Sequence, residues 1–330
     1  MQTAMPFADI IGHERVVEIF RRSIRSGKTS HAYIFEGPAG CGRKKTALTL
    51  IQALFCSQVD DDACGVCPSC RKVAGNNHGD IHFIEPLPEK RDISIAQLRD
   101  LQRELALRPY EAPRKACIME PADRMNLNSA NSFLKTLEEP PGNALIILLT
   151  ENADMLLPTI RSRCQLVRFA PLSSESVMLL LKRNGMDDTA ASLLSQLANG
   201  SMQRAAELDS DALAQRHEAV IKHLATLSLD RVATVFTASE ELGGNRDETL
   251  ELLDILLSFA RDMIHLASGC SDIINTTIRP TLEGLVSRLN LERTLQLAED
   301  ILETRRSVQR NANVKLALDH LFIKMAGAIA

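Results

Sequence analysis

The chain has no tryptophan and only two tyrosines among its 330 residues, Tyr33 and Tyr110. Single-stranded nucleic acids bind to exposed aromatic rings by base stacking, so this scarcity argues against a base-stacking surface. The formal net charge of −4 also argues against strong binding of phosphate backbones by the chain alone. We therefore expect any role with DNA or RNA to be shared with partner proteins.

Long hydrophobic runs are absent as well. No apolar stretch reaches the roughly 18 residues that a membrane-spanning helix requires, and the N-terminus lacks the basic and then apolar pattern of an export signal. The sequence contains eight cysteines, which in a reducing cytoplasm bind metals or fill cores. We expect a cytoplasmic protein with no membrane partner.

Strand and helix signals alternate through the first half of the chain, as they do in α/β folds. Short apolar strands are expected at residues 32–35, 81–84, 116–119, 144–149 and 167–169. Apolar residues at helical spacing predict helices at residues 43–55, 93–107 and 127–137. The pattern indicates an α/β domain over residues 1–170.

After Pro171 the pattern is purely helical. Segments 173–184, 187–198 and 201–208 indicate a small three-helix domain over residues 171–208. Longer amphipathic stretches follow at 249–266, 291–308 and 314–329. They predict an all-α C-terminal domain over residues 209–330, and the length of the chain agrees with two or three domains.

A glycine-rich loop with altered chemistry follows the first strand. Its glycines have the spacing G-x-x-x-x-G, which lets backbone N–H groups surround phosphates. Where this motif has Lys followed by Ser or Thr, the chain has Arg43 and Lys44. A lysine cannot ligate Mg²⁺ as a hydroxyl does, so binding of ATP with Mg²⁺ is doubtful. The loop residues assigned to this degenerate nucleotide site are Gly37, Gly40, Gly42, Arg43 and Lys44.

Four cysteines form the strongest metal signal, Cys56-x7-Cys64-x2-Cys67-x2-Cys70. Four thiolates at such short spacing can reach one tetrahedral Zn²⁺, and a full set of protein ligands indicates a structural rather than a catalytic ion. The alternative is four unrelated buried thiols or a disulfide pair, which the cytoplasmic context disfavours. We predict a structural zinc site.

Three further motifs appear in order along the chain. They are I-I-G-H at residues 10–13, L-K-T-L-E-E-P-P at 134–141 and S-R-C at 162–164. Together they resemble the clamp-loader branch of the AAA+ ATPases, closely over residues 7–208 and more weakly beyond. The resemblance implies an AAA+ P-loop domain, which has a parallel sheet flanked by helices and a zinc module at residues 56–70. A helical lid domain and an all-α collar that mediates oligomerisation would follow.

The resemblance also implies partners and a process. In this family, a pentameric ring of subunits opens a sliding clamp and places it on primed DNA during DNA replication. The chain would then join gamma/tau-type and delta-type subunits in a hetero-pentamer of the DNA polymerase III holoenzyme, a DNA-directed DNA polymerase. It would reach the sliding clamp and primed DNA through that complex.

In active members of the family, the third strand ends in an Asp-Glu pair that handles Mg²⁺ and water. Here the strand is followed by Glu120-Pro121. Glu120 can still bind a cation, but Pro121 has no side-chain base, and loss of a general base costs a factor of ~10²–10⁴ in rate. Asp123 is expected to cap or pair locally. We therefore predict little or no intrinsic ATP hydrolysis.

Other residues receive roles from the resemblance. Arg163 of the S-R-C motif would act as an arginine finger in a neighbouring subunit's ATP site, with Arg161 as an accessory contact. The alternative for both is that they only solubilise the domain. Thr150 would sense phosphate, although Asn152 or a simple turn fits as well. Arg204 would contact nucleotide from the lid helix, or persist as a relic or as a tether between the lid and the core.

Two other functions compete with this interpretation. The first is a working AAA+ motor subunit of the gamma/tau type, in which Arg43 and Lys44 replace the usual pair and arginine binds phosphate electrostatically. The second is a zinc-dependent nucleic-acid adaptor, which the acidic net charge and scarce aromatics disfavour.

Overall fold

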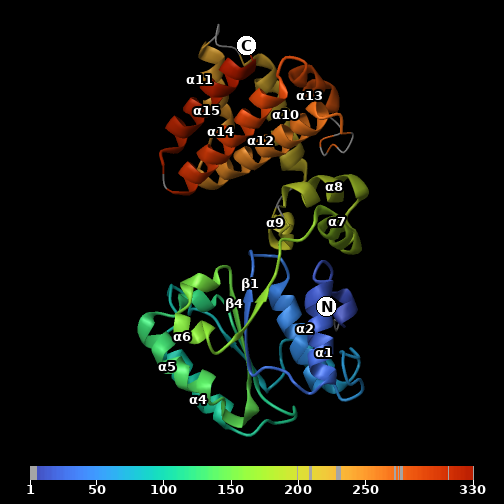
Figure 1. The fold of residues 1–330 in the computed structure, drawn as a ribbon, viewed down its shortest axis with the longest axis vertical. Coiled ribbons are helices and arrows are strands. Elements are labelled where there is room, and N and C mark those ends of the chain that lie inside the picture. The colour runs from blue at the N-terminus through green and yellow to red at the C-terminus, as the bar shows by residue number, and fades with distance from the viewer. Residues whose placement is uncertain are drawn as a thin grey trace. The chain divides into compact units, whose positions relative to one another are not determined.

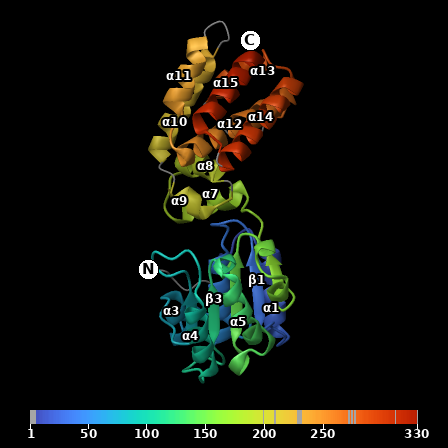
Figure 2. The same ribbon diagram turned by 90° about the vertical axis from the view of Figure 1, so that its left-hand side faces the viewer.

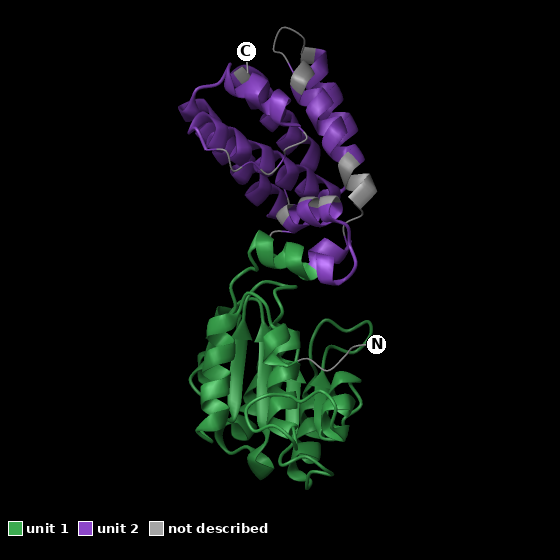
Figure 3. Ribbon diagram, turned by 90° about the vertical axis from the view of Figure 1, so that its right-hand side faces the viewer, with its two compact units in different colours: residues 1–180, 200–203 green, residues 181–199, 204–330 purple. Residues whose placement is uncertain are grey.

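The computed structural model describes residues 6–198, 200–207, 210–227, 232–270, 273, 275, 278–310 and 312–329. The chain forms an α/β part and an all-helical part (Figure 1). The chain divides into two compact units (Figure 3). The first contains residues 1–180 and 200–203, and the second contains residues 181–199 and 204–330. The three-domain division at residues 170 and 208 therefore stays a prediction, because the predicted lid is split between the two units.

The first unit contains a parallel five-stranded sheet with the strand order β2-β3-β4-β1-β5. All five carboxyl ends therefore lie at one edge of the sheet, where ligands of such folds bind. The α/β fold predicted from the sequence is confirmed. The strands are β1 (Ala32–Glu36), β2 (Ile81–Ile84), β3 (Ala116–Met119), β4 (Leu145–Thr150) and β5 (Gln165–Arg168).

The last strand begins two residues before the predicted position and ends one residue earlier. β5 pairs only with β1, with Tyr33 opposite Gln165, and is thus an edge strand. Gln165 and Leu166 are exposed, so this strand lacks the continuous apolar run by which buried parallel strands are recognised. Hydrophobicity alone therefore misplaced its start.

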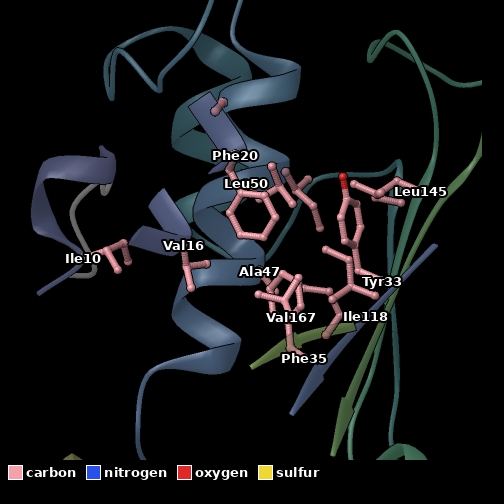
Figure 4. Packing of buried hydrophobic residues seen from close by; sticks show 14 of the residues in the cluster. Ile10, Val16, Phe20, Tyr33, Phe35, Ala47, Leu50, Ile118, Leu145 and Val167 are labelled. Atoms are coloured by element: carbon pink, nitrogen blue, oxygen red, sulfur yellow. The ribbon is translucent and has the colours of Figure 1, made fainter. Parts of the chain in front are cut away.

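Helices cover both faces of the sheet (Figure 1). Side chains alternate along β1, so that Tyr33 and Phe35 join the apolar cluster under α1 (Glu14–Arg25) and α2 (Arg43–Phe55). Ile34 joins the cluster on the opposite face. Figure 4 shows the first cluster, in which the Phe20 ring stacks on Phe35 at 5.5 Å. This two-sided burial fixes the register of the central strand.

The opposite face is covered by α4 (Ile95–Ala106) and α5 (Leu127–Glu138), which Figure 2 shows beside β3. Both helices have defined beginnings. Ser94 and Gln97 form a reciprocal capping box at α4, and the Asn126 side chain accepts from the Ser129 N–H at α5. Such caps satisfy N–H groups that have no partner within the helix.

The second half is helical, as predicted. Its long helix α12 (Arg246–Ala267) packs against α14 (Leu291–Gln309), which also contacts α15 (Val314–Ile329). The remaining helices from Pro171 onward are α7 (Ser174–Arg183), α8 (Asp188–Leu197), α9 (Met202–Glu207), α10 (Ser210–Thr226), α11 (Val232–Leu242) and α13 (Arg279–Val286). Within the described ranges, no helix combines the length and apolar character needed to cross a membrane.

Candidate functional site

The glycine loop lies at the carboxyl edge of the sheet, between β1 and α2. Gly40 and Gly42 have positive φ angles of 72° and 104°, a conformation that side chains with a Cβ disfavour. A Cβ on Gly37 would collide with the backbone oxygen of Phe169. The Gly37 N–H donates to the Thr150 carbonyl at the end of β4. The glycines are therefore required by the backbone path of the loop.

A later segment of the same unit packs against the middle of this loop. The Met202 N–H donates to the Gly40 carbonyl at 2.9 Å. A Cβ on Gly40 would collide with the Ser201 hydroxyl and approach Gln203 within 2.8 Å. Residues 200–203 thus lie directly on the loop.

Lys44 takes the position of the magnesium-binding hydroxyl and pairs with two carboxylates. Its Nζ lies 2.7 Å from Glu85 Oε1 and 3.3 Å from Glu120 Oε2. Glu85 follows β2 and Glu120 follows β3, which are neighbouring strands. Burial lowers the pKa of Lys44, but the two glutamates outweigh this and raise it. The lysine is therefore a fixed cation next to Glu120.

Arg43, in the position of the usual lysine, is buried. Its Nη1 has no hydrogen-bond partner within the part of the chain that the structure describes. The loop beside it is held by His13 of the I-I-G-H motif, whose Nε2 lies 2.7 Å from the Cys41 carbonyl oxygen. The His13 ring packs edge-on against Phe169. Sequence reasoning assigned no role to His13 or Glu85.

Lys45 and Thr46, which spell the usual dipeptide two residues late, contact other groups. Lys45 Nζ donates to the Asp9 carbonyl at 3.1 Å. The Thr46 hydroxyl donates to the Gly42 carbonyl within its own helix at 2.9 Å. Neither side chain therefore substitutes for the altered pair.

Thr150, the predicted phosphate sensor, is only 1% exposed. Its hydroxyl donates to Asp123 Oδ1 at 2.8 Å and accepts from the Asn152 N–H at 3.2 Å. The Asn152 side chain caps the next turn by accepting from the Asp154 N–H. Asp123 therefore bonds to a residue at the end of β4, 27 residues further along the chain, which differs from the local cap or pair expected from the sequence.

Arg204 forms an ion pair with Asp254 of α12. Arg305 Nε lies 2.8 Å from the other oxygen of the same carboxylate, and the Asp254 side chain is 6% exposed. A buried carboxylate between two arginines fixes Arg204 against α12 within the second unit. These contacts join Arg204 to C-terminal helices and are not the expected tether to the α/β core, and its contact with nucleotide stays a prediction.

The four cysteines predicted to bind metal lie together, with all four Sγ atoms within 4.8 Å of one another. The Sγ atoms of Cys64 and Cys70 are 3.9 Å apart. Two sulfur ligands that each lie about 2.3 Å from a tetrahedral ion are separated by roughly 3.8 Å, which is close to this distance. All eight cysteines of the chain are free thiols. The cluster can therefore hold one metal ion, and the structure has no disulfide pair in its place.

Backbone N–H groups point at the sulfur atoms of this cluster. Cys67 caps α3 (Pro68–Ala74) by accepting from the Cys70 N–H. Burial raises the pKa of Cys67, but N–H donors from Ser57 and Cys70 outweigh it and lower the pKa to about 6. The Gln52 side chain donates to the Cys70 carbonyl at 2.8 Å, which ties the cluster to α2. The N–H donors favour the thiolate of Cys67, the form that binds metals, whereas burial raises the pKa of the Cys70 thiol.

Arg163 follows the short helix α6 (Pro158–Arg161) and is partly exposed. Its Nη2 lies 2.6 Å from Glu138 Oε1, at the end of α5. Arg161 pairs instead with Asp154 at 2.7 Å. The structure therefore places both arginines on the surface, each in an ion pair with a different acid.

Comparisons with known proteins relate the whole chain to one group of replication proteins. The family profile described as DNA polymerase III, delta subunit, matches residues 12–173, and the profile for its C-terminal part matches residues 210–326. The chain is similar to DNA polymerase III subunit delta' of Bacillus subtilis, with 31% identity over 94% of this chain and 95% of the relative.

Three further similarities were found. Subunit delta' of Pseudomonas aeruginosa is 28% identical over 90% of this chain and 92% of its own length. Subunit tau of Escherichia coli is 29% identical over 73% of this chain but only 39% of its own length. A solved structure of a gamma subunit-related protein from Thermotoga maritima aligns with 95% of this chain and 99% of its own, at 18% identity and a TM-score of 0.44.

Proposed function

Since the chain belongs to the delta' (delta-prime) family of DNA polymerase III clamp-loader subunits, we propose that it acts in clamp loading as a subunit that does not hydrolyse ATP itself. In this proposal it completes the ATP site of a neighbouring subunit with Arg163. Its partners would be gamma/tau-type and delta-type subunits in a hetero-pentamer. The sliding clamp and primed DNA would be reached through that complex.

The contact of Lys44 with Glu120 is the observation that carries this proposal. A hydrolytic site needs a divalent cation between its hydroxyl ligand and the acid of the third strand. Here that acid faces an ammonium group at 3.3 Å, and Glu85 holds the same ammonium at 2.7 Å. A second positive charge is repelled from this position. The chain's own cation replaces the one that catalysis requires.

The loop contacts support the same conclusion. The Gly40 carbonyl is bonded to the Met202 N–H, and Thr150, the candidate sensor, is bonded to Asp123. Polar groups that are satisfied within the protein must exchange partners before they can bind a ligand, which weakens binding. A phosphate that bound to the Thr150 hydroxyl would have to displace Asp123, and residues 200–203 already lie against the loop at Gly40.

Zinc is the metal that the cysteine cluster fits best. Four thiolates at tetrahedral separation are the donor set of structural zinc sites, and no ligand position remains for water. The ion would hold the segment of residues 56–70 against α2 and α3. We also propose that residues 1–170, 171–208 and 209–330 act as P-loop domain, lid and collar. Exposed leucines on α14, among them Leu295 and Leu302, suit packing against sister subunits in the collar.

The alternative function is an ATP-hydrolysing motor subunit of the gamma/tau type. Arg43 favours it, because a buried guanidinium nitrogen that has no partner among the described residues could bind phosphate. The isolated full-length chain tests this alternative. Robust ATP turnover by that chain would establish a motor and refute our proposal.

Reconstitution of the complex tests the role of Arg163. We expect Arg163→Ala to leave assembly intact and to slow hydrolysis at the site it completes by at least ~10³-fold, as loss of an arginine finger does. Arg168→Ala is the matched control, because Arg168 is an exposed arginine of the same segment that pairs with Glu36. Wild-type turnover with Arg163→Ala would contradict the proposal.

A further inference from the structure

Arg163 is held by its own chain at each nitrogen of its guanidinium group. Nε and Nη2 both contact Glu138 Oε1, at 2.9 and 2.6 Å. Nη1 donates to the Thr159 carbonyl at 2.9 Å and to the Ser162 hydroxyl at 3.2 Å. The planar edge formed by Nε and Nη2, which suits recognition of a phosphate, is therefore occupied by a carboxylate.

We propose that Glu138 is a latch: it holds Arg163 in the unassembled subunit and releases it to the phosphate of a neighbouring subunit's nucleotide. This inference rests on the proposed function of Arg163 in trans. It adds a residue of this chain that restrains the arginine until the partner's nucleotide competes for it.

The exposure of the pair makes such an exchange possible. The side chains of Arg163 and Glu138 are 34% and 49% exposed, so water and a partner can reach both. An ion pair at this exposure is weak. A nucleotide phosphate has more negative charge and can accept two parallel N–H bonds, so it competes well with one carboxylate oxygen.

The position of Glu138 on its helix points to a role beyond helix stability. Glu138 is the last residue of α5, because Glu139 leaves the helical conformation and Pro140 follows it. A carboxylate at a helix C-terminus opposes the helix dipole and destabilises the end. Arg163 neutralises this charge from the segment after α6, which packs on α5. Each charge therefore depends on the other in the free subunit.

The first test uses the isolated full-length chain and phenylglyoxal, a reagent that modifies accessible arginines, with mass spectrometry to follow Arg163. Glu138→Gln should raise the modification rate of Arg163 about two- to fivefold, the factor by which an exposed ion pair shifts an equilibrium. Glu139→Gln is the matched control, because Glu139 is exposed and adjacent in sequence, and should leave the rate unchanged. An unchanged rate in Glu138→Gln would overturn the latch.

The second test uses the complex reconstituted with its sister subunits. Glu138→Gln should lower the KM for ATP about two- to fivefold and leave kcat nearly constant, because the phosphate no longer competes with a carboxylate. A fall in kcat at constant KM would mean that Glu138 orients the arginine for catalysis, and would overturn the latch. So would unchanged KM and kcat.

Arg163→Ala in the same assay separates the two proposals. If this variant hydrolyses ATP normally, the arginine has no role in trans and the proposed function fails. If Arg163→Ala is slow while Glu138→Gln behaves as the wild type in both tests, the proposed function holds and the latch alone is wrong.

Discussion

Replacement of Lys44 by threonine should strengthen the binding of a divalent cation beside Glu85 and Glu120. The change removes the ammonium that lies 2.7 Å from Glu85 and 3.3 Å from Glu120. It also supplies the hydroxyl that phosphate-binding loops use to ligate Mg²⁺. The two carboxylates are then left without their cation, which favours binding of another.

The size of the effect follows from the exposure of the pair. The Lys44 side chain is 44% exposed, so each ion pair contributes no more than about 0.2–1 kcal/mol after solvent screening. Two pairs give about 1 kcal/mol, and the new hydroxyl ligand adds to it. Because 1.4 kcal/mol corresponds to a tenfold change in affinity, we expect Lys44→Thr to bind a divalent cation about tenfold more tightly than the wild type.

Mn²⁺ serves as the probe, because free Mn²⁺ can be counted by electron paramagnetic resonance during a titration of the full chain. Lys45→Thr is the matched control: it removes the same charge from the next residue, but its Nζ contacts the Asp9 carbonyl instead. Adding Glu120→Gln to Lys44→Thr should abolish the gain. Equal affinities for the wild type and Lys44→Thr, or an equal gain in Lys45→Thr, would refute the reasoning.

Three further predictions concern metal content and stability. We expect elemental analysis to find near-stoichiometric zinc in the wild type and in Cys270→Ser, which changes an exposed thiol outside the cluster, but not in Cys67→Ser. Equal zinc in both variants would contradict the site. Burial lowers the pKa of His217 to about 4, whereas an unfolded histidine has a pKa of about 6.5. As the pH falls from about 7.5 to about 5, the unfolded chain therefore binds a proton that the folded chain does not. The wild type should lose about 2 kcal/mol of stability over this range relative to His217→Leu, measured by urea unfolding. Parallel pH profiles would contradict this assignment. Gly40→Ala should lower the free energy of unfolding by more than Gly27→Ala does. Both glycines have a positive φ, which costs a residue with a Cβ ~1 kcal/mol, but only the Cβ at Gly40 meets other atoms. Equal losses of stability would show that residues 200–203 do not pack tightly on the loop.

Local spacing was enough to predict the features that lie within one short segment. The loop glycines lie within six residues and the four cysteines within fifteen. Each group is brought together by local turns, so its arrangement follows from the spacing of its residues in the sequence. The strands were also predicted within a few residues, because buried parallel strands have continuous apolar runs, and so were helices α2, α4 and α5. Helices α1, α3 and α6 were missed. The helices α3 and α6 are short, whereas Val16, Val17 and Phe20 of α1 have the helical spacing of one buried face, a signal that the sequence contained.

Contacts between distant segments could not be predicted in this way. Glu85 reaches Lys44 only because β2 lies beside β3 in the sheet, and strand order is not written in the spacing of the sequence. The contact of Glu138 with Arg163 depends likewise on the packing of α5 against α6. The sequence singled out Lys44 and Arg163, but their partners Glu85 and Glu138 could be identified only from the fold.

The polar groups around the glycine loop show how a nucleotide site can remain folded without nucleotide. Buried or partly buried polar groups must find partners, or the folded state loses stability. Here Lys44 pairs with Glu120, the Gly40 carbonyl with Met202, and the Thr150 hydroxyl with an aspartate. The ammonium group of Lys44 stands where a metal ion would otherwise be needed. These contacts stabilise the loop from its own chain, and the Lys44 ammonium opposes the binding of Mg²⁺. In the function that we propose, loss of hydrolysis and retention of the fold would therefore share one physical cause.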